Sequence, residues 1–315
     1  MTRVAVIGAG VMGTNHARVL RTIAGVELVA VVEPDPQRAA AVARSVAADA
    51  VSIHELAGRV DAAVLATPSE THAELGCQLL ESGIDVLVEK PIATTVAQAQ
   101  QLIKTAAAHD RVLMVGHIER FNAAVVGLCK LVEEPVHLEF TRVGAFSPRI
   151  SSDVVLDLMI HDLDLALLLS GAGSFTGVHA VGRRVHSAEI DIASCLLSGD
   201  NGVTATLTAS RAGQNKIRSI EVTQRETFLS ADLLRQDLNV HRVAHNEFVT
   251  AGGTRYSQSG VVEIPYLDRL GEPLKVELEA FLAAVEQRTE PPVTGQQGQA
   301  ALELALQVSE LIGQG

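Results

Sequence analysis

The chain of 315 residues is long enough for two domains, each with its own core. Its formal net charge of −12 argues against binding to nucleic acid or to an anionic membrane, and no uncharged apolar run approaches the length of a membrane span. The cysteines at 77, 129 and 195 form no Cys-x-x-Cys motif and indicate reduced thiols in a cytoplasmic protein.

A glycine-rich turn follows a short β-branched run near the start of the chain. Gly8, Gly10 and Gly13 form the pattern Gly-x-Gly-x-x-Gly. The first glycine permits a tight turn, the second lets a pyrophosphate approach the backbone, and the third lets the next helix pack on the strand. The helix predicted after the turn, residues 14–23, offers N–H groups and a partial positive charge to the pyrophosphate, and Val11 and Met12 in the turn are expected to contact the cofactor. The turn therefore predicts a dinucleotide site.

An acidic residue ends the second predicted strand, residues 27–32. This is Glu33, at the distance from Gly13 where a dinucleotide fold places the acid that binds the adenosine ribose. A carboxylate there repels a ribose 2′-phosphate, so the sequence favours NAD over NADP. Because Arg38 is nearby, NADP binding stays an alternative. A solvated Glu at a strand end is the alternative, and the intact strand–turn–helix–strand unit argues against it.

Strands and helices alternate as far as about residue 117 and predict a doubly wound parallel sheet. Ligands of such a sheet lie at the carboxyl ends of its strands, where Thr67, Glu89, Lys90 and His117 fall. Lys90 is held extended by the proline that follows it and is placed to hydrogen-bond a reacting hydroxyl. An ordinary exposed lysine is the alternative.

The pattern changes after about residue 118 to strand-like runs joined by turns, which indicates a largely antiparallel sheet. The sequence thus predicts an α/β protein with a Rossmann domain over residues 1–118. Residues 119–315 are predicted to form an α+β domain with a large, mostly antiparallel open sheet. The polar segment 224–260 gives no assignment.

A predicted helix over residues 154–169 is apolar on nearly all sides and should be buried, yet it carries a polar stripe. Asp157, His161 and Asp164 fall on one face. A carboxylate one turn from an imidazole orients it and raises its basicity, which suits a general acid/base; a structural pair or a solvated stripe is the alternative. Asp162 points the opposite way and is expected to be structural. One His with several Asp lacks a convincing metal ligand set, so no metal site is predicted.

Basic residues gather in the second half of this acidic chain: Arg120, Arg142, Arg149, Arg211, Lys216 and Arg218. Together they suit a phosphate pocket, because arginine makes bidentate contacts with phosphate oxygens. Scattered solvated charges are the alternative for each residue taken singly.

This combination of motifs resembles the glucose–fructose oxidoreductase / inositol dehydrogenase (Gfo/Idh/MocA) family. The matching pieces are residues 8–19, Glu33, 66–72, 88–93, 116–122 and Asp157-x-x-x-His161. The resemblance implies a Rossmann domain, and a C-terminal sheet that forms the interface of a homodimer or homotetramer. It implies catalysis by Lys90, Asp157 and His161, and cofactor contacts that include Thr67, His72, Glu89 and Lys90.

Finer pieces, at 115–122, 142–150, 157–165 and 216–222, resemble the UDP-N-acetylglucosamine 3-dehydrogenase branch. They imply NAD-dependent oxidation of a secondary sugar hydroxyl, with substrate contacts from Lys90, Arg120, Arg142, Arg149, Asp157, His161 and Lys216. Ala145 stands where the branch has a proline, and residues 210–215 lack its Trp and Pro. A dehydrogenase of inositol or of a free sugar is therefore an alternative, as is, in another class, a non-catalytic NAD- or sugar-binding sensor.

Overall fold

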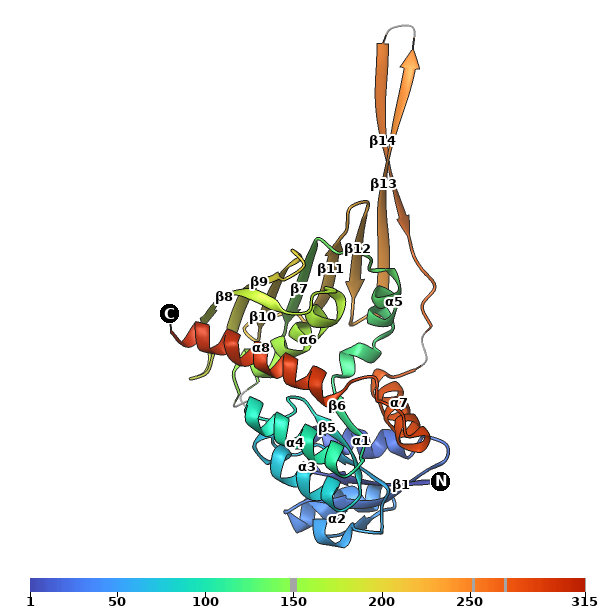
Figure 1. Cartoon of the computed structure of the whole chain (residues 1–315), viewed down its shortest axis with the longest axis vertical. Coiled ribbons are helices and arrows are strands. Elements are labelled where there is room, and N and C mark those ends of the chain that lie inside the picture. The colour runs from blue at the N-terminus through green and yellow to red at the C-terminus, as the bar shows by residue number, and fades with distance from the viewer. Residues whose placement is uncertain (148–151, 251–252, 269–270, 315) are drawn as a thin grey trace. The chain divides into compact units, whose positions relative to one another are not determined.

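The computed structural model describes residues 1–147, 152–250, 253–268 and 271–314, of which 244–250 and 253–258 by backbone alone (Figure 1). The chain divides into two compact units, residues 1–121 with 270–303 and residues 122–269 with 304–315. The sequence predicted one division after residue 118. The segment 270–303 joins the first unit because helix α7 (Pro273–Gln287) packs on helix α1 (Val11–Leu20).

A six-stranded parallel sheet forms the core of the first unit, in the order β3-β2-β1-β4-β5-β6. Its strands are β1 (Thr2–Ile7), β2 (Val26–Val32), β3 (Asp49–Ala50), β4 (Ala62–Leu65), β5 (Asp85–Glu89) and β6 (Leu113–Gly116). β1 pairs with both β2 and β4, so the strand order reverses at β1, where a doubly wound sheet binds its ligand. The predicted Rossmann sheet is confirmed.

Helices connect these strands, as the sequence predicted. They are α1, α2 (Pro36–Ser45), α3 (His72–Glu81) and α4 (Val96–Ala108), with short helical turns η1 (Ile53–Glu55), η2 (Ser69–Thr71) and η3 (Ile118–Phe121). Local chemistry sets their starts: the side chain of Asp35 accepts hydrogen bonds from the N–H groups of Gln37 and Arg38, and Thr95 forms a capping box with Gln98. The last helix, α8 (Gly295–Gly313), contributes residues to both units.

An eight-stranded sheet forms the core of the second unit, in the order β14-β13-β12-β11-β7-β10-β9-β8. The strands are β7 (His137–Val143), β8 (Phe175–Arg183), β9 (Ile192–Gly199), β10 (Thr204–Ser210), β11 (Ile217–Thr223), β12 (Thr227–Asp232), β13 (Asp237–Thr250) and β14 (Gly253–Glu263). Only β7 and β10 pair in parallel. The predicted, mostly antiparallel open sheet is confirmed.

One face of this sheet is covered and the other is open. Along β7, Leu138 and Phe140 are buried while Glu139 between them is exposed, which is the alternation of a half-buried strand. Helix α6 (Ile160–Leu169) and the π turn η4 (Val155–Met159) pack on β7 and β10, and α5 (Ala123–Leu131) packs on β12 and β13. The covered face is therefore the one that carries the predicted acid/base helix.

Two local features differ from the sequence prediction. Residues 224–260, which gave no assignment, form most of β12, β13 and β14, and the last two make a long hairpin that is drawn in orange in Figure 1. The helix predicted over 154–169 begins with a π turn before it becomes regular. In the part of the chain that the structure describes, no helix is both long and apolar enough to cross a membrane.

Candidate active site

The glycine turn has the geometry that its sequence predicts. Gly8 has φ +96°, and a Cβ there would lie 2.5 Å from the carbonyl oxygen of Ala66. A Cβ on Gly13 would lie 1.8 Å from the carbonyl oxygen of Gly8, so neither position accepts a side chain. A Cβ on Gly10 would meet no atom within 4 Å, and Val11 at the start of α1 is 77% exposed. The turn therefore leaves an open approach to the N-terminus of α1, which fits the pyrophosphate of a dinucleotide.

Glu33 ties the end of β2 to this turn. Its Oε2 accepts a hydrogen bond of 2.8 Å from the N–H of Ala9, and its Oε1 accepts one of 3.2 Å from the N–H of Asp35. Arg38 lies 3.6 Å from Oε1. The carboxylate is thus fixed beside the turn where the ribose acid of a dinucleotide fold belongs. Arg38 stands next to it, as the sequence suggested.

His72 braces two strand ends. Its ring nitrogens lie 2.9 Å from the carbonyl oxygen of Thr67, after β4, and 2.9 Å from that of Pro91, after β5. The residue is 1% exposed, and burial lowers the pKa of the ring although both carbonyls favour the charged form. Thr67 is half-buried and its hydroxyl bonds to that of Thr71. We infer that His72 shapes the cofactor site by holding these loops.

Glu89 and Lys90 lie at the end of β5, and the peptide bond from Lys90 to Pro91 is cis. Oε1 of Glu89 lies 2.7 Å from Nε2 of His16 in α1, and Oε2 accepts a hydrogen bond from the N–H of Lys90. Burial disfavours the charged form of Glu89, but the hydrogen bond from His16 and the charges of His16 and Lys90 outweigh it and lower its pKa. Glu89 therefore links the turn that carries Lys90 to α1, the helix that follows the glycine turn.

The predicted acid/base pair lies at one turn of the second unit. Asp157 belongs to the π turn η4 and His161 to the first turn of α6, and both are half-buried. Asp153 starts this segment: its side chain accepts hydrogen bonds from the N–H of Leu156 and the hydroxyl of Ser309. π turns occur frequently at functional sites. The predicted one-turn spacing of Asp157 and His161 is therefore present on a helix anchored at its start.

Arg142 forms a buried ion pair with a residue of α6. Its Nε donates to Oδ2 of Asp162 over 2.9 Å and its Nη2 to Oδ1 over 2.7 Å, with both side chains almost fully buried. A bidentate pair of this kind fixes the guanidinium beside that carboxylate. The substrate contact predicted for Arg142 stays a prediction. Asp162 is structural, as its place on the helix indicated.

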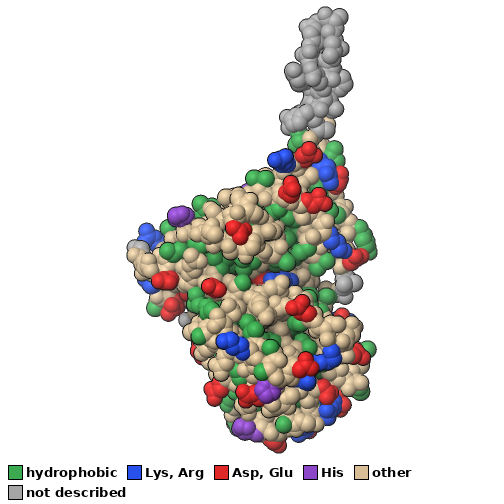
Figure 2. Space-filling model, in the orientation of Figure 1, with side chains coloured by type: hydrophobic (Ala, Val, Ile, Leu, Met, Phe, Trp, Pro, Cys, Tyr) green, Lys and Arg blue, Asp and Glu red, His purple; other side chains and the backbone are tan. Residues whose placement is uncertain are grey.

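The other predicted basic residues are not gathered into one cluster by the contacts of the described chain. Arg211 is 1% exposed and donates to Asp191 over 2.7 Å. Lys216 is exposed just before β11, Arg120 is half-buried in η3 of the first unit, and Arg149 lies outside the described residues. On the face seen in Figure 2, Lys and Arg side chains are scattered among Asp and Glu.

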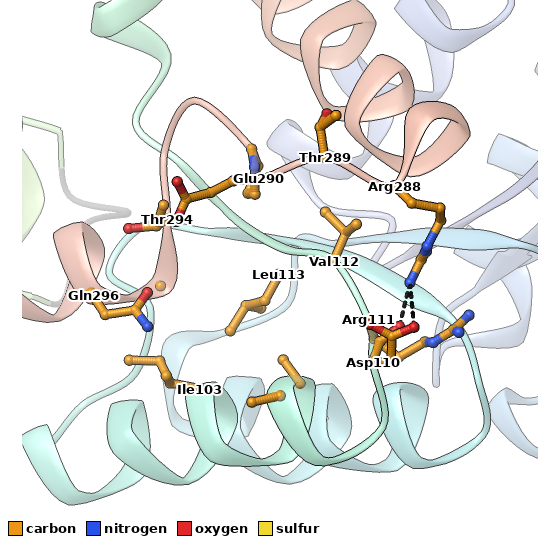
Figure 3. Close-up of a pocket in the computed structure, with 14 residues that line it drawn as sticks. Ile103, Asp110, Arg111, Val112, Leu113, Arg288, Thr289, Glu290, Thr294 and Gln296 are labelled. Atoms are coloured by element: carbon orange, nitrogen blue, oxygen red, sulfur yellow. Dashed lines mark hydrogen bonds and ion pairs between the residues drawn. The ribbon is translucent and has the colours of Figure 1, made fainter.

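A cavity of about 290 Å³ lies in the first unit beside the start of β6, the strand at one edge of the sheet (Figure 3). It is lined by α4, by Val112 and Leu113 at the start of β6, and by the segment after α7. Arg288 at its rim is engaged in an ion pair of 2.8 Å with Asp85. The cavity carries no acid/base pair placed for hydride transfer. Among the described residues no group of three His, Cys, Asp or Glu side chains is arranged to hold a metal ion.

Two buried residues of the first unit escaped the sequence interpretation, His16 and Glu277. His16 is fully buried in α1 and Glu277 is fully buried in α7. His16 lies in α1, just after the glycine motif, but one sequence gives no sign that it meets Glu89, 73 residues later. Glu277 lies on a buried face of α7, where an acidic residue among leucines is the only available signal.

Comparison with known proteins agrees with this site. The model of the oxidoreductase family with an NAD-binding Rossmann fold matches residues 2–117, and that of the GFO/IDH/MocA C-terminal domain matches residues 136–226. The chain therefore belongs to the Gfo/Idh/MocA family. It is an NAD-dependent dehydrogenase that acts on CH–OH groups, so the alternative of a non-catalytic sensor is not retained.

Particular relatives are similar over the whole chain. UDP-N-acetylglucosamine 3-dehydrogenase of Acidithiobacillus ferrooxidans is 33% identical over 97% of this chain and 96% of its own length. A solved structure of that enzyme superimposes with a TM-score of 0.90, covering 99% of this chain and 97% of the other. Inositol 2-dehydrogenase of Rhizobium meliloti is 27% identical over 96% of this chain and 94% of its own length. Levoglucosan dehydrogenase with NADH, 20% identical at a TM-score of 0.84, shares the fold.

Proposed function

We propose that this protein oxidises a secondary hydroxyl of a nucleotide sugar, with UDP-N-acetylglucosamine oxidised at C3 as the favoured case. The observation that carries the proposal is full-length similarity to a UDP-N-acetylglucosamine 3-dehydrogenase, at 33% identity. The chain also has the residue set that the reaction needs, with Lys90 at the end of β5 and Asp157 and His161 at one helical turn.

In this proposal His161 takes the proton of the sugar hydroxyl. Asp157 orients the imidazole and stabilises its charged form, as a carboxylate beside a general base does. Lys90 hydrogen-bonds the same oxygen and favours the developing alkoxide. NAD⁺, when bound, accepts the hydride at C4 of its nicotinamide. Glu33 and the N-terminus of α1 hold the adenosine end of the cofactor, and His72 and Glu89 keep the loops around Lys90 in place.

The diphosphate of the substrate needs cationic partners in this proposal. The candidates are Arg120, Arg142, Arg149 and Lys216, of which Arg142 is also paired with Asp162. Lys216 is exposed immediately before β11, whose centre pairs with β7 on the sheet that carries α6. Each charge-assisted hydrogen bond to a phosphate oxygen contributes about 1.5–3 kcal/mol.

Substrate comparison tests the proposal. NADH formation is measured with UDP-N-acetylglucosamine, the corresponding UDP-uronic acid and myo-inositol at equal concentrations. We expect the highest kcat/KM for a UDP-sugar. Similarity over 96% of the chain to an inositol 2-dehydrogenase makes inositol oxidation the second candidate. Turnover of inositol, with none for either UDP-sugar, would reject the nucleotide-sugar proposal.

We also propose a homodimer or homotetramer formed through the open face of the eight-stranded sheet. Apolar side chains are exposed on several of its strands: Val181 is 70% exposed, and Leu196 and Ile217 are each 42% exposed. Light scattering during size-exclusion chromatography measures the mass directly. A monomer at micromolar concentration would contradict this assembly, and Leu196→Lys should dissociate it if the sheet face is responsible.

A cytoplasmic location is part of the same proposal. Cys77, Cys129 and Cys195 are not disulfide-bonded to one another, and burial raises the pKa of Cys195 to about 12, which leaves that thiol unreactive. Fractionation of the producing cells tests the location, because recovery in an oxidising compartment would contradict it.

A further inference from the structure

Glu277 is a buried acidic group that the proposed mechanism does not use. It lies in α7, is 0% exposed, and neither carboxyl oxygen has a hydrogen-bond partner among the described residues. A buried carboxylate without partners is strongly disfavoured, whereas a neutral carboxylic acid can be accommodated. The residue therefore calls for a physical explanation.

The surroundings of Glu277 belong to the cofactor side of the first unit. α7 packs on α1 and η3, and Arg18 of α1 forms an ion pair of 2.7 Å with Glu272 just before α7. The titratable and charged groups on these elements and on the adjoining strand ends are His16, Arg18, Glu89, Lys90, His117, Glu119 and Arg120. Of these, Glu89 acts on Glu277 directly through its negative charge.

Burial raises the pKa of Glu277 well above its ordinary value, and the charge of Glu89 raises it further. Both effects favour the protonated form of Glu277. His16 belongs to α1, the helix on which α7 packs. It bonds to Glu89 through Nε2, and its Nδ1 is buried without a hydrogen-bond partner among the described residues.

We propose that Glu277 is a positioning residue that stays protonated beside the His16–Glu89 pair. Glu89 then remains the single negative charge of this cluster, and it fixes the Lys90 turn against α1. Glu89 contacts both the N–H of Lys90 and the ring of His16. A second negative charge on Glu277 would repel Glu89 and disturb both contacts. The charge of Glu277 therefore acts on Glu89, and through the contacts of Glu89 it reaches the cofactor turn by way of α1 and the reacting oxygen by way of Lys90.

Two properties follow at alkaline pH. Loss of the Glu277 proton should weaken NAD⁺ binding, because α1 carries the pyrophosphate site. It should also lower kcat, because the Lys90 turn is no longer held. Neither property depends on which sugar is oxidised. The role of Glu277 can therefore be wrong while the proposed substrate is right, and the proposed substrate can be wrong while the role of Glu277 is right.

The test compares Glu277→Gln with Glu279→Gln, an exposed glutamate of the same helix. NAD⁺ affinity is measured from neutral to alkaline pH by isothermal titration calorimetry in the absence of sugar. Gln keeps the shape and neutrality of the protonated acid, so the ratio of the wild-type Kd to that of Glu277→Gln should rise with pH, by up to about tenfold per unit. Glu279→Gln should follow the wild type throughout. Wild-type and Glu277→Gln profiles that run parallel would overturn the proposal.

Infrared difference spectroscopy gives a second readout that does not use activity. The spectrum of wild type minus Glu277→Gln should contain the carbonyl band of a protonated carboxylic acid at neutral pH, which a carboxylate band replaces at alkaline pH. Glu89→Gln removes the negative charge that acts on Glu277. In this variant the carboxylate band of Glu277 should replace the acid band at a lower pH than in the wild type, but still at a higher pH than in an unburied glutamate. A carboxylate band already present at neutral pH would contradict the proposal. Glu277→Met serves as the second neutral variant, and it should lose the same band.

Discussion

The two units of the protein bury charge in different ways. In the second unit, Arg142 is paired with Asp162, and Arg211 with Asp191, by close hydrogen-bonded contacts. In the first unit, Glu89 is paired with His16, but Glu277 and Nδ1 of His16 have no hydrogen-bond partner among the described residues. Fully paired charges hold a fold in one arrangement. An incompletely paired cluster can gain or lose a proton, and this one joins α1, which follows the glycine turn, to Lys90 at the end of β5.

The contributions of Asp191 in the second unit and Glu277 in the first unit to folding stability change with pH in opposite directions. Burial disfavours the charge of Asp191, but the hydrogen bonds from Arg211 and from the N–H groups of His186 and Val185 outweigh it and hold its pKa well below the ordinary value. That stability is present at neutral pH and is lost as pH falls through the low folded-state pKa. Glu277 has a raised pKa, so its contribution falls as pH rises above the ordinary value for glutamic acid.

The largest expected effect is on kcat, and it distinguishes residues that act in the reaction from residues that stabilise the fold. His161→Ala and Lys90→Met should each lower kcat by roughly 10²–10⁴-fold, the contribution of a positioned acid/base group. NAD⁺ affinity and the melting temperature should change little in His161→Ala. Asp157→Asn should be milder, because the carboxylate orients the base and does not itself take the proton. Steady-state kinetics with calorimetry measure this, and an equal loss of NAD⁺ binding and activity in His161→Ala would make the residue structural.

Arg142→Met should show the opposite behaviour. It leaves the carboxylate of Asp162 buried without its guanidinium, which costs about 3–5 kcal/mol of unfolding free energy. Removing both charges in Arg142→Met/Asp162→Leu should recover much of that loss. Chemical denaturation measures the three proteins. Unchanged stability, with a raised KM for the sugar, would favour the predicted substrate contact of Arg142 instead.

Lys216→Met tests whether an exposed cation of the second unit contacts the substrate diphosphate. We expect KM for the UDP-sugar to rise on the order of tenfold, with a smaller change in kcat, because a phosphate contact is made in ground and transition states alike. Arg225→Met, at the other end of β11 and also exposed, is the matched control. Equal effects of the two variants would show a general charge effect.

Glu33→Ala should narrow the preference for NAD⁺ over NADP⁺. The substitution removes the carboxylate that repels a 2′-phosphate and releases Arg38, which lies 3.6 Å from it. We expect NAD⁺ affinity to fall about tenfold, the loss of one charge-assisted hydrogen bond. Glu27→Ala, at the exposed start of the same strand, is the control. Equal affinities of the wild type for both cofactors would contradict the role of Glu33.

The smallest effect is on stability and concerns the incompletely paired cluster. Glu277→Gln should stabilise the protein more at pH 8 than at pH 5, because the folded wild type keeps a proton that the unfolded chain has already lost, and the cost of keeping it grows with pH. Thermal unfolding at both pH values measures the difference, with Glu279→Gln as the control. A larger gain at pH 5 would reverse the sign of the Glu277 shift.

Local rules explain which parts of this protein could be predicted. The glycine turn follows from the steric demands at Gly8 and Gly13, and the one-turn spacing of Asp157 and His161 follows from helical periodicity. Contacts between residues that only the tertiary fold brings together could not be predicted. His16 contacts Glu89, 73 residues away in the sequence, and Arg142 on strand β7 contacts Asp162 on helix α6. Segment 224–260 gave no assignment because polar and charged residues dominate it, although Leu229, Ala231, Leu238 and Val240 in β12 and β13 are buried in alternation.

The central claim is that this protein transfers a hydride from a nucleotide sugar to NAD⁺, with His161 as the base. UDP-N-acetylglucosamine deuterated at C3 tests it most directly, with mass spectrometry of both products. We expect deuterium in the nicotinamide of the reduced cofactor and a slower reaction than with unlabelled sugar in single turnover. His161→Ala should form both products roughly 10²–10⁴-fold more slowly. Deuterium that remains on the sugar while NADH forms would contradict oxidation at C3, and no NADH from any UDP-sugar would contradict the substrate class.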